Sequence, residues 1–435
     1  MHDPLNPLDI ASDELTQRSE SGFDVSGIEA ELRDAPADDV ARIEAIYDEL
    51  LHTTRGPDWN FDEPEGLTSI VESWPEPSGR DDPGRPVDPG RILGSWLGRV
   101  AGCNLGKPVE EGTIWTSERI REYLELAGSY PLRNYIPALD PMPAGFILRE
   151  NWPHTTLGRV DGSDRDDDID YAILSLHLLE QNGRDLSTRH VADGWLAFLP
   201  YTRVYTAERA TYVNLLHNVP VSDTGMHRNP YREWIGAVIR GDAFGWVNPG
   251  RPRAAARHAH QDAVLSHRAN GVYGEMWAAA LVSAALTAES AAEAITMSLA
   301  VIPVQSRLAE AVHTVRTLHE LGTTWEDALS VIQDRYGHYS WVHTVNNAAI
   351  ITAGLLWGED DFSTAVGTTV QGGWDTDSNG ATVGSVMGAL HGAAALPGHF
   401  IQPLRDRTRS AVFGYDHSRI SDLAARTVAL AARLE

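Results

Sequence analysis

The chain has 435 residues, of which 42% are hydrophobic and 22% are charged, a composition typical of a globular protein with ample material for a core. The formal net charge of −26 argues against broad binding to nucleic acid, although a local pocket could still take an anionic small molecule. The single cysteine, Cys103, excludes an internal disulfide and a zinc site built from several thiolates.

Residues 1–88 differ in composition from the rest of the chain. They are acidic, they lack the basic and apolar regions of a signal peptide, and they end in the Pro/Gly-rich run SWPEPSGRDDPGRPVDPG. Helical spacing of apolar residues predicts one helix within DDVARIEAIYDELLHTT. We expect an accessory helical extension with a partly disordered start. No apolar run spans a membrane, so we expect a cytoplasmic protein with no membrane partner.

From residue 89 onward, apolar residues recur with the 3.6-residue period of helices, and the two-residue alternation of strands is nearly absent. Clusters of Gly and Pro separate the periodic runs. We therefore expect one all-α domain over residues 89–435. The runs that predict its helices are 91–104, 167–180, 187–199, 276–302, 307–321, 325–335, 344–357, 380–396 and 420–434.

Two acidic segments stand where helices are expected to begin. One carboxylate is enough to cap a helix. The helix dipole stabilises each negative charge at a helix start by only ~0.3–1 kcal/mol, which is less than the repulsion between adjacent carboxylates. Closely spaced carboxylate and hydroxyl oxygens suit Mg²⁺, Mn²⁺ or Ca²⁺. We expect the two segments to meet at one site with enough ligands for two cations. The segments are RDDDIDY, with Asp166, Asp167, Asp168 and Asp170, and WDTDS, with Asp375, Asp377 and Ser378.

Two stripes of glycine repeat at every fourth residue. Each Gly within a helix lowers stability by about 0.5–1 kcal/mol relative to Ala. A close approach of two helix backbones, which leaves no room for side chains, would explain why glycine is present at these positions. We predict that the two helices pack antiparallel and bring Glu110 to the acidic segments. The Gly106-Lys107 pair is no phosphate-binding loop, because Ala101 and Pro108 break that pattern. The stripes are Gly94, Gly98, Gly102 and Gly106, and Gly380, Gly384, Gly388 and Gly392.

Taken together, these motifs resemble the ADP-ribosylglycohydrolase family, which includes the dinitrogenase reductase-activating glycohydrolase. The similar stretches follow the family's order over residues 91 to about 396 and leave the first 88 residues outside. They are Gly98, Gly102, Gly106, Pro108 and Glu110 of the family's first motif; Asp166-Asp167-Asp168-Ile169; Asp262-Ala263-Val264-Leu265-Ser266-His267; and Asp375-Thr376-Asp377-Ser378.

The resemblance implies an all-α domain with a binuclear Mg²⁺ or Mn²⁺ centre that hydrolyses the glycosidic bond of an ADP-ribosyl group. The substrate would be an ADP-ribosylated protein or a smaller ribosyl compound. Glu110 would be the acid/base or substrate-orienting carboxylate. The implied metal ligands are Asp166, Asp167, Asp168, Asp375, Asp377 and Ser378. The residues expected to contact substrate are Ser266, His267, Asn270 and Tyr273, as a polar and aromatic wall for a nucleotide, and Trp374, as a stacking face.

The chain departs from the family pattern at several positions. Cys103 replaces an Asp, Asp166 adds a charge where Thr is common, and Trp374 replaces a Gly; Ile169 and Ser378 each replace a Thr. These changes leave the substrate open. Two alternatives also stay open, a non-catalytic member of the fold that binds metal or nucleotide, and a binuclear metal phosphohydrolase. His267 has an alternative role as well, capping carbonyl groups at a helix end.

Overall fold

The computed structural model describes residues 4–75, 88–358 and 360–434. These residues contain 21 α-helices and no β-strand, which confirms the all-α prediction. The helices are α1 (Pro7–Glu20), α2 (Ser26–Arg33), α3 (Val40–Leu51), α4 (Leu67–Glu72), α5 (Pro89–Gly106), α6 (Ser117–Leu126), α7 (Trp152–Thr155), α8 (Asp167–Asn182), α9 (Thr188–Phe198), α10 (Thr206–Leu216), α11 (Asp242–Trp246), α12 (Pro252–Ala263), α13 (Ala269–Ala285), α14 (Ala291–Ser298), α15 (Arg307–Glu320), α16 (Trp325–Tyr336), α17 (Thr344–Leu356), α18 (Phe362–Gln371), α19 (Thr376–His391), α20 (Gly398–Ile401) and α21 (Ile420–Leu434).

Most periodic apolar runs correspond to one helix each. The run 276–302 is the exception, because it is divided between α13 and α14. Ser290 accepts a hydrogen bond from the Glu293 amide at 3.2 Å and so caps the start of α14. A polar cap within the apolar run therefore starts a second helix there.

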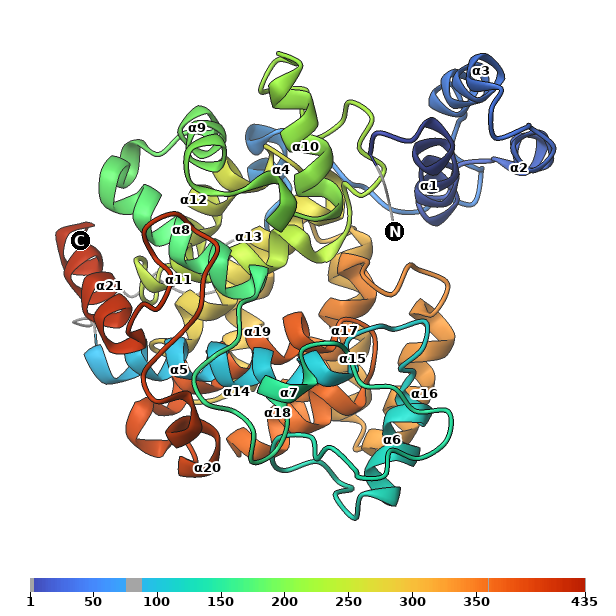
Figure 1. Ribbon diagram of the computed structural model, residues 1–435. Coiled ribbons are helices and arrows are strands. Elements are labelled where there is room, and N and C mark those ends of the chain that lie inside the picture. The colour runs from blue at the N-terminus through green and yellow to red at the C-terminus, as the bar shows by residue number, and fades with distance from the viewer. Residues whose placement is uncertain (1–3, 76–87, 359, 435) are drawn as a thin grey trace.

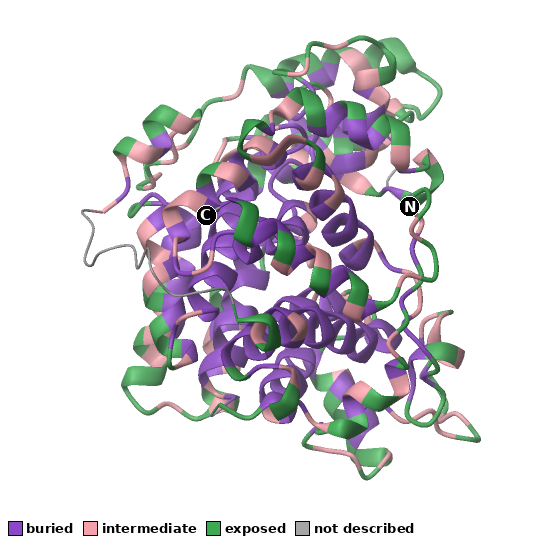
Figure 2. Cartoon of the chain, turned by 90° about the vertical axis from the view of Figure 1, so that its left-hand side faces the viewer, coloured by how far each residue is buried: buried purple, intermediate pink, exposed green. Residues whose placement is uncertain are grey.

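Helices α5 and α19 pack against each other along their length and form the centre of the main body (Figure 1). In α19 every residue from Thr376 to Leu390 is buried, and in α5 every residue from Gly94 to Gly106 is buried. Figure 2 shows buried residues concentrated in the inner helices and exposed residues in the surrounding shell. Buried residues lie on every side of these two helices because other helices cover them.

The glycine stripes face each other, and the predicted antiparallel pairing is confirmed. A Cβ atom added to Gly102 would lie 1.9 Å from the Gly380 carbonyl oxygen, so only glycine fits there. The C-terminal end of α5 lies against the N-terminal end of α19, where the Thr376 hydroxyl donates to the Gly106 carbonyl at 2.9 Å. The facing pairs are Gly94 with Gly388, Gly98 with Gly384, and Gly102 with Gly380.

The N-terminal extension has a small core of its own, built from α1, α2 and α3. Figure 1 shows these helices as a group beside the main body. The single predicted helix is α3, and the start of the extension, expected to be partly disordered, is helical from Pro7. Helix α4 behaves differently, since its Ile70 and the following Trp74 belong to the core of the main body. The apolar residues of the small core are Ile10, Ala11, Val25, Ile28, Leu32, Ile43, Ile46, Tyr47 and Leu50.

Candidate functional site

The N-terminal ends of α8 and α19 meet, and they bring the two acidic segments together. Asp166 is the N-cap of α8 and accepts a hydrogen bond from the Asp168 amide at 2.9 Å. Asp375 holds the N-cap position of α19. The Ser378 hydroxyl donates to Asp168 Oδ2 at 3.1 Å across 210 residues of sequence. The predicted meeting of the two segments is confirmed by these contacts.

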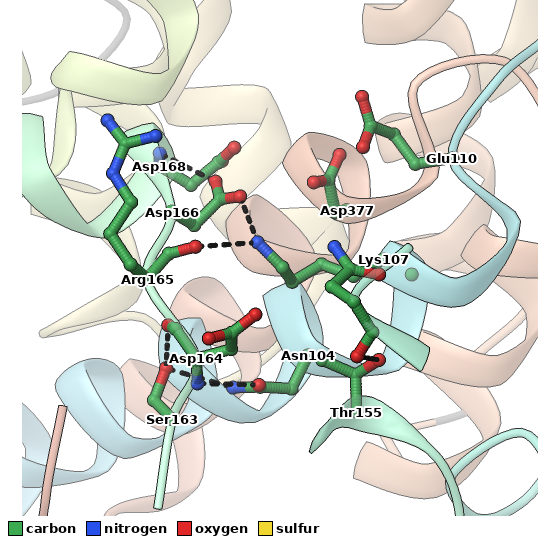
Figure 3. A network of polar contacts seen from close by, with 12 residues as sticks. Asn104, Lys107, Glu110, Thr155, Ser163, Asp164, Arg165, Asp166, Asp168 and Asp377 are labelled. Carbon is green, nitrogen blue, oxygen red and sulfur yellow. Dashed lines mark hydrogen bonds and ion pairs between the residues drawn. The ribbon is translucent and has the colours of Figure 1, made fainter. Parts of the chain in front are cut away.

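Two groups of side chains place possible metal-ligand atoms within 4.8 Å of one another, and Asp377 belongs to both. The first group consists of Glu110, Asp375 and Asp377, and the second of Cys103, Asp166, Asp168 and Asp377. Figure 3 shows Asp377 between Glu110 on one side and Asp166 on the other. Clustered carboxylates that share one member are the arrangement in which hard divalent cations bind, so the role of these residues as ligands stays a prediction that the geometry allows.

Glu110 lies at the edge of the cluster, directly after a 3₁₀ turn, Lys107–Val109, that continues α5. The Glu110 side chain keeps 22% of its surface exposed, and its Oε2 lies 3.5 Å from an Arg149 nitrogen. Arg149 also donates to Glu111 at 3.1 Å, so the loop on which Glu110 stands is held from outside. Burial, together with the nearby Asp377 carboxylate, raises the pKa of Glu110 well above its usual range.

Among the other carboxylates of the cluster, Asp166 has its charge neutralised by a neighbouring lysine, whereas Asp168, Asp375 and Asp377 carry raised pKa values. Burial opposes ionisation of Asp166, but the Lys107 ammonium outweighs it and lowers the pKa of Asp166 to about 2. Burial and the Asp166 charge raise the pKa of Asp377 to about 6, and burial also raises the pKa of Asp168 and of Asp375. Without a cation the cluster is therefore electrostatically strained.

Two of the aspartates that open α8 lie outside both groups. Asp167 is half-buried, and burial and Asp166 raise its pKa, but it is a member of neither ligand group. Asp170 is fully buried and accepts hydrogen bonds from the Ser410 hydroxyl at 2.7 Å and the Ala411 amide at 2.8 Å. Asp170 therefore anchors the chain near residue 410 instead of facing the cluster.

A family model of the ADP-ribosylglycohydrolases matches residues 86–434. The chain belongs to the ADP-ribosylglycohydrolase family. None of the curated proteins matches its sequence. A solved structure described as "ADP-ribosylglycohydrolase-related protein complex" is 18% identical, with a TM-score of 0.46, and the alignment covers 80% of this chain and 99% of that chain. In the described part of this family member, no helix has both the length and the apolar character needed to cross a bilayer.

Four residues expected to form a nucleotide wall are not brought to the carboxylate cluster of this family member. Ser266, His267, Asn270 and Tyr273 are fully buried. The Ser266 hydroxyl contacts His267 at 2.7 Å and accepts from the buried Arg240 at 3.0 Å. Because their polar groups face the interior, the structure does not present these two side chains to a substrate.

The other two members of that expected wall contact the N-terminal extension. Asn270 donates to Glu63 at 2.7 Å, and the Tyr273 hydroxyl donates to the Pro64 carbonyl at 2.5 Å. The polar character that predicted a nucleotide contact therefore serves the docking of residues 63 and 64.

Trp374 is the one expected substrate contact that lies beside the cluster, immediately before Asp375. Its φ of 61° falls in the left-handed region that favours glycine, the residue that the family pattern has at this position. Its Cα would lie 3.2 Å from a Cβ atom added to Gly112, two residues after Glu110. Trp374 thus borders the carboxylates while holding a strained backbone conformation.

Sequence reasoning missed three residues that organise the cluster. The Lys107 ammonium contacts Asp166, and Arg99 donates to the Asp168 carbonyl at 2.9 Å. The Asn347 side-chain oxygen accepts from the Asp375 amide at 3.2 Å. A buried polar residue inside the apolar run 344–357 was the available signal for Asn347, and Lys107 carried none beyond the rejected phosphate-loop pattern.

Proposed function

We propose that the chain is a metal-dependent hydrolase that cleaves the glycosidic bond of an ADP-ribosyl group or of a related ribosyl compound. The observation that carries this proposal is the convergence of Glu110, Asp375 and Asp377, because it adds a carboxylate from the end of α5 to those at the start of α19. Membership of a glycohydrolase family supports the reaction class. An ADP-ribosylated protein or a small ribosyl metabolite would be the partner, and the expected cytoplasmic location stays a prediction.

A divalent cation fits this group of residues. Glu110, Asp375 and Asp377 offer only hard oxygen atoms, which Mg²⁺ and Mn²⁺ prefer. The pKa values of all three carboxyl groups are raised, so a bound cation would relieve the repulsion between their charges. When bound, the cation would supply Lewis acidity and a grip on the hydroxyl groups of the ribose. The resemblance implies two such ions.

The protein's own groups suit a reaction that builds positive charge on the anomeric carbon of ribose. Glycoside cleavage passes through an oxocarbenium-like state, which the negative carboxylates stabilise. Glu110 is the acid/base group in this proposal: it offers one oxygen atom to the cation, and its partly exposed carboxyl group leaves the other oxygen to exchange a proton with water or with the leaving group. Arg149, with a nitrogen 3.5 Å from Glu110 Oε2, helps to hold this carboxyl group in place.

Product analysis tests the proposal. The full-length protein is incubated with Mg²⁺ or Mn²⁺ and a panel of arginine-linked, serine-linked, base-linked and free ADP-ribosyl compounds, and the products are identified by mass spectrometry. We expect the release of free ADP-ribose or of a free ribosyl product, and we expect EDTA to abolish this release. The Asp377→Asn variant should be inactive, whereas the matched control Asp185→Asn, at an exposed position, should be as active as the wild type. Release of phosphate would favour the phosphohydrolase, and no product on any substrate would favour a non-catalytic binding protein.

A further inference from the structure

The ammonium group of Lys107 lies inside the acidic cluster. Lys107 is 2% exposed, its Nζ contacts the Asp166 carboxylate, and the same Nζ donates to the Arg165 carbonyl at 3.0 Å. Figure 3 shows the side chain extending from the end of α5 toward Asp166. Asp166 is a member of the second ligand group, so a fixed positive charge of the protein already occupies that side of the cluster.

The remaining members of this second group offer little to a second hard cation. Cys103 is buried and brings a soft sulfur atom, which Mg²⁺ and Mn²⁺ bind weakly compared with oxygen. Asp168 already accepts from the Ser378 hydroxyl at 3.1 Å, and its other oxygen lies 3.5 Å from Arg99. Two cationic side chains thus face the carboxylates from which a second cation would have to take its oxygen ligands.

The first ligand group is different. Glu110, Asp375 and Asp377 supply oxygen atoms alone, and no ammonium group contacts them within the described residues. The Arg149 guanidinium lies 3.5 Å from Glu110 and makes its shorter contact, at 3.1 Å, with Glu111. Arg149 is therefore the one cationic side chain paired with this group in the described residues, it lies at the outer member, and Asp375 and Asp377 form no ion pair there that would compete with a single cation.

We propose that this chain holds one divalent cation, at Glu110, Asp375 and Asp377, and that the Lys107 ammonium takes the place of the second cation that the family resemblance implies. The inference rests on the proposed metal-dependent function. A single cation also accounts for two departures from the family pattern. The negative charge added by Asp166 is balanced by Lys107, and Cys103 stands in place of a carboxylate in the second ligand group, which binds no cation in this proposal.

Metal stoichiometry tests the inference without any measurement of activity. The full-length protein is stripped with EDTA, equilibrated with Mn²⁺, and measured by elemental analysis and by electron paramagnetic resonance. Two Mn²⁺ ions that share a carboxylate lie about 3.5–4 Å apart and couple magnetically, whereas a single ion gives an uncoupled six-line spectrum. We expect one ion per chain and the uncoupled spectrum for the wild type.

Variants identify the group that replaces the second ion. Lys107→Met removes the ammonium and should raise the count to two with a coupled spectrum, while Lys107→Arg keeps a charge and should stay at one. Asp166→Asn should retain the single ion, and Asp375→Asn should weaken its binding at least tenfold.

Each other outcome overturns the inference in a recognisable way. Two ions in the wild type would reject it and leave the proposed function standing, and no ion would reject the metal dependence of that function as well. One ion in both the wild type and Lys107→Met would show that Lys107 does not set the number. The wild-type count needs no variant, so the test holds even if Lys107→Met fails to fold.

Discussion

Gly98 and Gly384 face each other where α5 and α19 cross, and neither has room for a side chain. A Cβ atom added to Gly98 would lie 2.0 Å from the Gly384 carbonyl oxygen, and one added to Gly384 would lie 2.1 Å from the Gly98 carbonyl oxygen. Helix α5 leads into Glu110, and α19 begins beside Asp377. The backbone contact between the two glycines therefore fixes how the acid/base candidate and the shared aspartate lie relative to each other.

Replacing Gly384 by Ala should separate the two helices. The added methyl group meets backbone atoms that cannot rotate away, and we expect a loss of about 1–3 kcal/mol or more in the free energy of unfolding, with a marked loss of activity. Urea unfolding followed by circular dichroism measures the stability. Gly27→Ala is the matched control, because a Cβ atom at Gly27 in α2 would meet nothing within 4 Å. Equal stability of Gly384→Ala and wild type would contradict the close-contact argument.

The metal-free protein should become less stable as pH rises from about 4 to about 6. The pKa of Asp377 is raised to about 6, so over this interval the folded state holds a proton that the unfolded state has already released. Asp377→Asn should therefore be more stable than the metal-free wild type at pH 7, by roughly 1–3 kcal/mol, and similar to it below pH 4. Thermal unfolding at several pH values provides the measurement.

Added Mn²⁺ should reverse this order. The cation binds the folded wild type and stabilises it, whereas Asp377→Asn lacks the shared ligand and should respond little. If the metal-free variant is less stable than the wild type at pH 7, then Asp377 is a structural cap and not a ligand held under charge repulsion.

The helix pair and the acidic ends were predictable because their causes are local in sequence. A Gly at every fourth position of an apolar run is unfavourable in a helix unless a backbone lies against it, so the spacing predicts the contact directly. Likewise, a helix start that carries more carboxylates than one N-cap requires indicates that these carboxylates belong to a common binding site. The antiparallel direction followed from placing Glu110 and Asp377 at one end, and the facing of Gly94 with Gly388 confirms it.

The rest depended on partners far away in the chain. Asn270 is 207 residues from its partner Glu63, and Tyr273 is 209 residues from Pro64, so their polarity alone could not distinguish a substrate wall from a docking surface. Lys107 meets Asp166 across 59 residues. A single sequence gives residue types and spacing, and it does not reveal which distant charge neutralises which buried group.

Glu63 should hold the N-terminal extension to the main body. Arg307 is 1% exposed and donates to both Glu63 oxygens, at 2.9 and 3.0 Å. Glu63→Gln removes the charge from a buried ion pair, and we expect a loss of about 3 kcal/mol in the free energy of unfolding. The exposed pair of Glu29 and Arg33 provides the control, since Glu29→Gln should change stability by less than about 0.5 kcal/mol.

Limited proteolysis adds a local measurement for the same variant. Cleavage within residues 52–66 should become faster in Glu63→Gln and stay unchanged in Glu29→Gln, because only the first change loosens the segment that joins α3 to α4. Equal cleavage rates in the two variants would show that other contacts hold the extension.

Glu20, at the end of α1, should make the docking of the extension sensitive to pH. Its carboxyl group is buried against the main body, where Oε1 accepts from the Ser340 amide at 2.5 Å. Burial, and the charge of Glu233 to a smaller extent, raise the pKa of Glu20 from 4.5 to about 7, although the Ser340 hydrogen bond acts in the opposite direction. The folded state therefore keeps a proton on Glu20 between pH 4.5 and 7 that the unfolded state has lost.

Stability must then fall as pH rises through that interval, because ionisation of Glu20 is easier in the unfolded chain. Glu20→Gln keeps the shape of the protonated acid and cannot ionise. It should match the wild type near pH 4.5 and exceed it at pH 8, by at most about 3 kcal/mol. Urea unfolding at pH 5 and pH 8 measures the difference, with the exposed Glu49→Gln as the control that should follow the wild type at both values. A Glu20→Gln variant that is less stable than the wild type at pH 8 would mean that Glu20 docks as a carboxylate and that its charge, not its proton, holds α1 in place.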